Sequence, residues 1–280
     1  MKIILLLFIL AIFKATNATL GVDLSSLTSS SSFGCLKLNG FEFAIVRCYQ
    51  SFGRVDPNCA SSILNAWNAG MNRVDAYMFP CFSCGNPAGQ ANTLVSYLKT
   101  NNVNYGMIWI DIEGPGTYWG SSQSANAAFF TDLVSAFEKE GVSIGVYTSI
   151  SQWQPIMGSY SGGSKFQLWY AHYDGVTSFN DFTEFSGWSK PNIKQYLGEN
   201  SLCGANCHSD LYYHYIYLCL YYSLYWYLLK NMTPTSPPPP PQTTTVSSGG
   251  ATTPTTTAGN SNVNSISGVV IVQVYHPPSD

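Results

Sequence analysis

The chain of 280 residues is 45% hydrophobic and only 10% charged, and its formal net charge is −3. This mild acidity offers no basic stripe for nucleic acid or for an anionic membrane surface, so we expect neither as a partner. Tyr, Asn, Ser and Gly are abundant instead. Such a composition is common on surfaces that bind neutral polar ligands such as sugars.

The first eighteen residues predict a cleaved export signal. Lys2 is followed by an unbroken apolar run over residues 3–13, and the small residues Thr16 and Ala18 suit a signal peptidase. The apolar run is too short to span a bilayer. We therefore expect a mature chain that begins near Thr19 and is delivered outside the cell or to a lysosome-like compartment.

An exported chain with eight cysteines is expected to form disulfide bonds rather than metal or redox sites. Many pairings are possible, so the sequence leaves the connectivity open. Cys81-Phe82-Ser83-Cys84 has the spacing of a redox motif, but export and the lack of a thioredoxin-like context favour a structural role. The eight are Cys35, Cys48, Cys59, Cys81, Cys84, Cys203, Cys207 and Cys219.

Strand-like and helix-like stretches alternate over residues 21–213, which is the rhythm of repeated βα units. The runs 44–46 and 107–110 are continuously apolar, as strands buried on both faces of a parallel sheet are. A closed β/α barrel usually needs ~250 residues, so some helices must be trimmed. We predict an α/β fold, a modified (β/α) barrel that resembles a TIM barrel. The predicted strands are 21–24, 41–49, 73–79, 105–113, 143–147, 166–173 and 192–197, with an eighth near Asp210, and the predicted helices are 59–69 and 125–140.

The segment 107–115 carries two acids at the end of a strand-like run. Period-two alternation places Asp111 and Glu113 on the same side of one strand, and Gly114-Pro115 then ends it. The preceding residues are apolar, so two neighbouring carboxylates there are costly unless they have a function. In β/α barrels, catalytic groups gather at this carboxyl end. Neighbouring carboxylates disfavour each other's ionisation, so one can remain a general acid while the other is charged, as glycoside hydrolysis requires.

Asp23 is an acid in the strand-like first segment of the expected mature chain. A helix N-cap or a turn would be an equally good explanation of this residue by itself.

Five motifs in this order over residues 21–200 resemble glycoside hydrolase family 25. They are Gly-Val-Asp-Leu-Ser from residue 21, Trp-Ile-Asp-Ile-Glu from 109, Gly-Val-Tyr-Thr-Ser from 145, Leu-Trp-Tyr-Ala-His-Tyr from 168 and Lys-Gln-Tyr from 194. The resemblance implies a barrel enzyme with no metal and no cofactor. It also implies cleavage of the β-1,4 bond between N-acetylmuramic acid and N-acetylglucosamine in bacterial peptidoglycan, with retention of configuration.

The same resemblance assigns roles to the acids. Glu113 would be the catalytic acid/base, Asp111 would orient the substrate's acetamido group or stabilise charge, and Asp23 would line the same cleft. The family has a further acid in its last barrel strand, for which Asp210 is the nearest candidate. The nucleophile stays open between an aspartate and the substrate's own acetamido oxygen.

Aromatic residues at or near the ends of predicted strands are candidate platforms for sugar rings, with core packing as the alternative for each. Arg47 is a charge within an apolar strand, so we expect it to pair with a cleft carboxylate or in a structural ion pair. His172 is expected to be a packed neutral imidazole, and the four scattered histidines predict no metal site. The aromatic candidates are Tyr49, Tyr77, Tyr147, Trp169 and Tyr196.

Residues 211–229 break the pattern, with eight tyrosines and no acidic or basic residue. A membrane helix fits the length, but Tyr prefers the membrane interface, and we favour a translated non-coding segment. Pro, Thr and Ser then dominate over 233–267, which predicts a disordered stalk that follows a glycosylation sequon at Asn231. The predicted division is a signal peptide (1–18), a catalytic barrel (19–213), an anomalous Tyr/Leu-rich segment (211–230) and a Pro/Thr/Ser-rich tail (231–280).

These features predict a secreted, monomeric lysozyme that degrades bacterial cell walls in digestion or defence. One rival is a carbohydrate-binding protein whose altered last strand has abolished catalysis, although the retained Asp111 and Glu113 argue against it. The other is a surface glycoprotein tethered to the membrane by residues 211–229.

Overall fold

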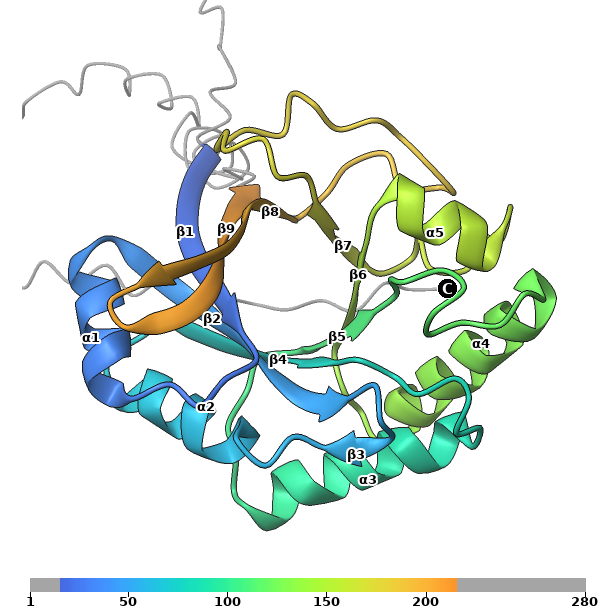
Figure 1. Cartoon of the computed structure of the whole chain (residues 1–280), viewed down its shortest axis with the longest axis horizontal. Helices are drawn as coiled ribbons and strands as arrows, with labels where there is room; N and C mark the ends of the chain where they lie inside the picture. Colours follow the sequence, from blue (N-terminus) through green and yellow to red (C-terminus); the bar gives the residue numbers. More distant parts are fainter. Residues whose placement is uncertain (1–15, 216–280) are drawn as a thin grey trace, which may run out of the picture. The chain divides into compact units, whose positions relative to one another are not determined.

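The computed structural model describes residues 16–215, which form a barrel with helices around it (Figure 1). Most of the predicted export signal, most of the Tyr/Leu-rich segment and the whole Pro/Thr/Ser-rich tail lie outside the described residues, so they stay predictions. The strands are β1 (Thr16–Leu24), β2 (Phe41–Gln50), β3 (Arg54–Val55), β4 (Arg73–Met78), β5 (Ile108–Asp111), β6 (Ile144–Thr148), β7 (Gln167–Ala171), β8 (Ile193–Leu202) and β9 (Ala205–Tyr215), and the helices are α1 (Ser30–Leu38), α2 (Cys59–Asn68), α3 (Pro87–Thr100), α4 (Gln123–Lys139) and α5 (Ile150–Met157).

The sheet closes on itself because β1 pairs on both of its sides. It runs parallel to β2 and antiparallel to β9. The ring continues through β8, β7, β6, β5 and β4 back to β2, while the short β3 pairs with the end of β2. Among the described residues, eight strands therefore form the wall, which confirms the predicted modified (β/α) barrel.

The last strand departs from the parallel sheet that repeated βα units predict. β9 runs antiparallel to both of its neighbours, β1 and β8. Two residues, Cys203 and Gly204, connect β8 to β9, and both have positive φ angles, 54° and 74°. Two-residue turns of this kind form hairpins, whereas a parallel connection needs a crossover of a dozen residues or more. The short turn thus dictates the reversed direction.

Five helices in the part of the chain that the structure describes lie outside the barrel (Figure 1). α2 and α4 agree with the two predicted helices. The sequence pattern does not reveal α1, which buries only Phe33 and Leu36 and is nucleated by the Ser29 side chain capping the Ser32 amide. Residues 172–192, between β7 and β8, contain no helix, which accounts for part of the predicted trimming.

Apolar side chains fill two separate regions. Phe43 and Ile45 of β2 face the barrel interior, whereas Ala44 and Val46 pack in the outer core that includes helix residues. Trp109 fills the interior so completely that a Cβ on Gly145 of the neighbouring β6 would lie 2.3 Å from its ring. Only glycine fits there. The inner cluster is Phe43, Ile45, Met107, Trp109, Tyr147, Trp169 and Ile193.

Asp75 is a buried acid in the barrel interior, near the amino ends of β4 and β5. Asp75 accepts hydrogen bonds from Arg73 Nε at 3.0 Å, from the Met107 amide at 3.1 Å and from Trp109 Nε1 at 3.0 Å. The Arg73 guanidinium also lies 5.2 Å from the centre of the Tyr212 ring. Tyr212 belongs to the Tyr/Leu-rich segment, so the first residues of that segment are part of β9 and of the barrel floor.

Three disulfide bonds join cysteines of the described region. Cys35–Cys203 links α1 to the turn between β8 and β9, Cys48–Cys59 links β2 to α2, and Cys81–Cys84 closes a short loop after β4. Disulfide formation is thus confirmed as expected. Cys207 is buried and forms no disulfide bond with another cysteine of residues 16–215, and Cys219 lies beyond residue 215. Over residues 16–215, no helix is both long and apolar enough to cross a membrane.

Candidate active site

Four acids meet at the carboxyl end of the parallel strands. Asp23 lies at the end of β1, Asp111 is the last residue of β5, Glu113 follows two residues later, and Asp210 lies on β9 opposite Gly21. The charge of Asp23 raises the pKa of each of the other three. The structure therefore brings all four acids named from the sequence into one electrostatic cluster.

Burial and like charge favour protons in this cluster. Burial raises the pKa of Asp111 well above its usual range, and Glu113 and Asp23 raise it further. The pKa of Glu113 is also raised, first by burial and then by Asp23, while His208 opposes the shift. Asp111 Oδ1 is buried without a hydrogen-bond partner among the described residues. An acid held in its neutral form in this way can donate a proton near neutral pH.

The backbone around Glu113 is fixed by β6 and α5. The Ile112 amide donates to the Tyr147 carbonyl at 2.9 Å, and Thr148 Oγ1 donates to the Ile112 carbonyl at 2.8 Å. The Gly114 amide donates to Gln152 Oε1 at 2.8 Å. Glu113 thus follows a segment anchored on both sides.

Asp23 is held by two side chains that the sequence did not single out as site residues. Gln195 Nε2 donates to Asp23 Oδ2 at 2.6 Å, and His208 Nδ1 lies 2.9 Å from Asp23 Oδ1. Gln195 Oε1 in turn accepts from the hydroxyls of Tyr147 and Tyr173, both at 2.7 Å. One feature of the sequence indicates the position of Gln195. Side chains alternate between the two faces of β8, so Gln195, between Lys194 and Tyr196, faces the barrel interior.

Asp210 is the fully buried acid of β9. Its Oδ1 accepts from Trp169 Nε1 at 2.9 Å, while Oδ2 has no hydrogen-bond partner in the described part of the chain. Burial first, and then Asp23, raise the pKa of Asp210 well above the usual range. This carboxyl group is therefore kept in its neutral form over a wider pH range than an exposed aspartate.

The structure brings together three of the five aromatic candidates. Trp169 contacts Tyr147 and Tyr77, with ring centres 4.5 Å and 6.2 Å apart. Tyr49 is elsewhere, buried in the outer core, and Tyr196 lies at a bulge of β8 next to Ser209. Tyr173 is the aromatic residue that sequence reasoning missed, because its contact with Gln195 depends on the course of the chain after β7.

Arg47 forms a structural ion pair rather than a pair with a carboxylate of the cleft, the two arrangements that the sequence left open. Its Nε donates to the buried Asp56 at 2.7 Å, and Nη2 donates to the Ser25 carbonyl at 3.1 Å. Its positive charge still lowers the pKa of Asp111, against the larger effects of burial and neighbouring acids.

His172 does not pack as a neutral core imidazole, so that expectation is wrong. Its side chain is 54% exposed, and Nδ1 pairs with Asp181. His172, Asp174 and Asp181 have ligand-type atoms within 4.8 Å of one another. The buried Lys194 ammonium already pairs with both acids, at 2.8 Å and 3.0 Å, so this cluster has its own counter-charge.

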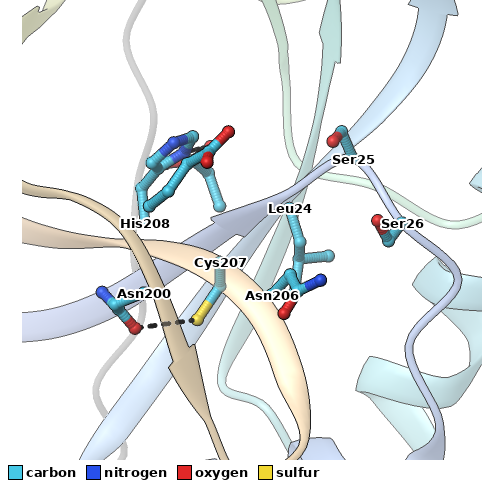
Figure 2. Close-up of a pocket in the computed structure, with 9 residues that line it drawn as sticks. Leu24, Ser25, Ser26, Asn200, Asn206, Cys207 and His208 are labelled. Atoms are coloured by element: carbon cyan, nitrogen blue, oxygen red, sulfur yellow. Dashed lines mark hydrogen bonds and ion pairs between the residues drawn. The ribbon is translucent and has the colours of Figure 1, made fainter.

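A polar cavity of about 770 Å³, including open solvent, reaches one of the four acids, Asp23. It lies between Ser25 and Ser26, which follow β1, and the β8–β9 hairpin, which contributes Asn200 and His208 (Figure 2). Asp23 also lines it. A cavity of this size and polarity can take part of a polar chain such as a glycan.

Comparison with known proteins gives consistent results. A protein-family model described as Lysozyme-like protein 1 matches residues 14–196. "Probable GH family 25 lysozyme 2" of Dictyostelium discoideum is 57% identical over 202 residues, which cover 72% of this chain and 94% of the relative.

Two solved structures share the fold. The family GH25 lysozyme from Aspergillus fumigatus has a TM-score of 0.58 and 22% identity, covering 70% of this chain and 94% of its own. The modular autolysin LytC from Streptococcus pneumoniae, solved with a synthetic peptidoglycan ligand, has a TM-score of 0.57 and 17% identity. The match covers 71% of this chain and 47% of the autolysin. Sequence and fold together show that the chain belongs to the lysozymes of glycoside hydrolase family 25.

Proposed function

We propose that this protein is a muramidase that hydrolyses the β-1,4 bond between N-acetylmuramic acid and N-acetylglucosamine in bacterial peptidoglycan. The observation that carries the proposal is the position of Glu113, whose pKa is raised by burial and by Asp23 in the mouth of a family 25 barrel. A protonated carboxyl group near a charged carboxylate is the arrangement that glycoside hydrolysis uses. The relatives named as family 25 lysozymes support the same substrate.

In the proposed reaction Glu113 gives its proton to the glycosidic oxygen as the bond from that oxygen to the anomeric carbon breaks. The positive charge that develops on the sugar ring is stabilised by the neighbouring Asp23 carboxylate. The configuration-retaining intermediate forms with an aspartate or with the substrate's acetamido oxygen, which Asp111 would orient. Glu113, now a base, takes a proton from water as the water attacks, and the site returns to its starting state.

Tyr77, Tyr147 and Trp169 are the aromatic residues that we propose as part of the substrate cleft. Tyr77 and Tyr147 each contact the Trp169 ring, and the Tyr147 hydroxyl donates to the Gln195 that holds Asp23. Aromatic faces of this kind stack against the apolar side of a sugar ring. Tyr49 is not included, because its side chain is buried in the outer core.

The test is clearing of a suspension of purified bacterial cell walls by the protein and by a Glu113→Gln variant. We expect at least a hundredfold loss in the variant, a scale typical of removing a general acid. Glu138→Gln is the matched control, because Glu138 lies on α4 in an exposed ion pair with Lys165. Thermal unfolding of all three proteins checks that they are equally folded.

Mass spectrometry of the released fragments identifies the bond. A muramidase leaves N-acetylmuramic acid at the reducing end, whereas a glucosaminidase leaves N-acetylglucosamine. No clearing by a folded parent, or full activity of Glu113→Gln, would contradict the proposal.

We also propose that the protein is exported before it acts. Three disulfide bonds in the described residues favour an oxidising compartment. N-terminal sequencing of protein from the culture medium should give Thr19 as the first residue. Cleavage there would remove three β1 residues, whose partners are 213–215 of β9, and would leave the pairing from Thr19 to Asp23 in place.

A further inference from the structure

His208 lines the cavity (Figure 2) and also contacts Asp23 of the acid cluster. It is the direct partner of Asp23 across the β1–β9 ladder, so backbone pairing itself sets the two side chains beside each other. Its Nδ1 lies 2.9 Å from Asp23 Oδ1, and its ring stacks on Tyr173 at 6.5 Å with a 14° angle between the planes. The side chain is 30% exposed, whereas that of Asp23 is 4% exposed.

This contact completes the hold on Asp23. Gln195 binds Oδ2, so with His208 on Oδ1 each carboxylate oxygen has a partner and the carboxylate is oriented from both sides. Because a carboxylate accepts, Nδ1 must carry a proton, and a second proton on Nε2 makes the ring a cation. Gln195 contributes no charge, whereas His208 can.

The groups around His208 favour its cationic form. They are Asp23 on β1, Glu199 on β8 and Glu113 beyond β5, while Tyr173 beyond β7 stacks on the ring. Burial would lower the pKa of His208, but the hydrogen bond to Asp23 and the charges of the three acids raise it above the usual value. In return, the positive charge of His208 lowers the pKa of Glu113 against burial and Asp23.

We propose that His208 is a positioning residue of the site: its Nδ1–H fixes the Asp23 carboxylate oxygen that Gln195 does not hold, and its ring brings a positive charge to the edge of the acid cluster. The proposal rests on the muramidase activity proposed above. His208 then acts in two ways: its hydrogen bond orients the Asp23 carboxylate, and its positive charge lowers the pKa of Glu113.

Two substitutions divide these effects. His208→Asn keeps an N–H donor close to the position of Nδ1 but cannot become cationic, whereas His208→Phe keeps the ring that stacks on Tyr173 and loses both donor and charge. Cell-wall clearing is measured as kcat and kcat/KM from about pH 4 to pH 9. Thermal unfolding of each variant reports its folding.

We expect both variants to move the alkaline limb of kcat/KM to higher pH, by roughly half a pH unit or more, because Glu113 keeps its proton longer without the neighbouring cation. We expect kcat at the optimum to fall by about tenfold in His208→Phe and by no more than about threefold in His208→Asn. His172→Asn, on the outside of the barrel, is the matched control and should leave the limb unmoved.

A second measurement does not depend on activity. NMR titration of the His208 imidazole should show that Asp23→Asn lowers its pKa. An unchanged titration, an unmoved alkaline limb in a folded His208→Asn, or parental kcat in His208→Phe would each overturn the proposal. If the parent fails to clear cell walls while the imidazole titration responds to Asp23→Asn, the proposed function fails and the His208–Asp23 coupling stands.

Discussion

At the scale of single residues, this site concentrates acids that folding disfavours. Asp111 and Asp210 are buried, and each has a carboxylate oxygen without a hydrogen-bond partner among the residues that the structure describes. Such groups are stabilised by a bound proton and destabilise the fold when they ionise. The chain keeps them where they can serve chemistry rather than stability.

Asp210→Asn should make the protein more stable while reducing cell-wall clearing. The pKa of Asp210 is raised in the folded state, so its bound proton favours folding. This stabilisation is fully present at pH values below the ordinary pKa of aspartate, and it is lost as the pH rises toward the pKa of Asp210 in the folded protein. Asparagine does not titrate and can still accept the Trp169 N–H. The gain in unfolding free energy should therefore grow from pH 4 to pH 7, to about 1 kcal/mol or more.

Denaturant unfolding at several pH values measures this gain. Asp132→Asn, at an exposed position of α4, should show no such pH-dependent gain. A gain for Asp210→Asn that stays constant with pH would contradict the assignment of a raised pKa.

Gln195→Leu should both destabilise the protein and impair clearing. It removes the partner of Asp23 Oδ2 and of two tyrosine hydroxyls in a buried setting. Each buried polar group left unpaired costs about 1–3 kcal/mol, so a loss of about 3 kcal/mol or more in unfolding free energy is expected. Tyr173→Phe removes one of these bonds and should lose about 1 kcal/mol. Equal losses in the two variants would argue against a shared network.

The sequence predicts the acids better than their partners. Asp111 and Glu113 stand out because alternation and Gly114-Pro115 mark a strand end within one short segment. The roles of Gln195, Tyr173 and His208 arise from contacts between strands far apart in the chain, so the local pattern carries little trace of them.

At the scale of elements, the strands follow from apolar runs, and the helices follow less well. α2 and α4 are predicted because their apolar residues recur with helical spacing, while α1 is serine-rich and α5 contains Pro155. The direction of β9 depends on a two-residue turn that an expectation of repeated βα units overlooks.

Among the three disulfides of residues 16–215, the Cys35–Cys203 bridge should contribute most to stability. It ties α1 to the hairpin whose residues line the cavity and spans 168 positions, against 3 for Cys81–Cys84. Chain entropy gives about 5 kcal/mol for so long a loop and about 2 kcal/mol for so short a one. Denaturant unfolding of the two double Cys→Ser variants should show this order, and a larger loss for the Cys81–Cys84 pair would refute it.

At the scale of the whole molecule, residues 19–215 should fold as a unit. The described residues already contain the closed ring of strands and all four acids of the candidate site. A chain that stops at residue 215 should keep a cooperative thermal transition and the proposed clearing activity. A chain that stops at residue 204 lacks β9 and Asp210 and should show neither. Circular dichroism on heating and the clearing assay read out both.

The pairing of β1 with β9 also sets the order of events during synthesis. During synthesis, the edge of β1 that pairs with β9 has no partner strand until nearly the whole domain has been translated. Contacts between such distant segments slow folding, and an open sheet edge invites misassociation in the meantime. Asp23 meets Asp210 and His208 only when the ring shuts, so the nascent protein cannot acquire its acid cluster before its fold is complete.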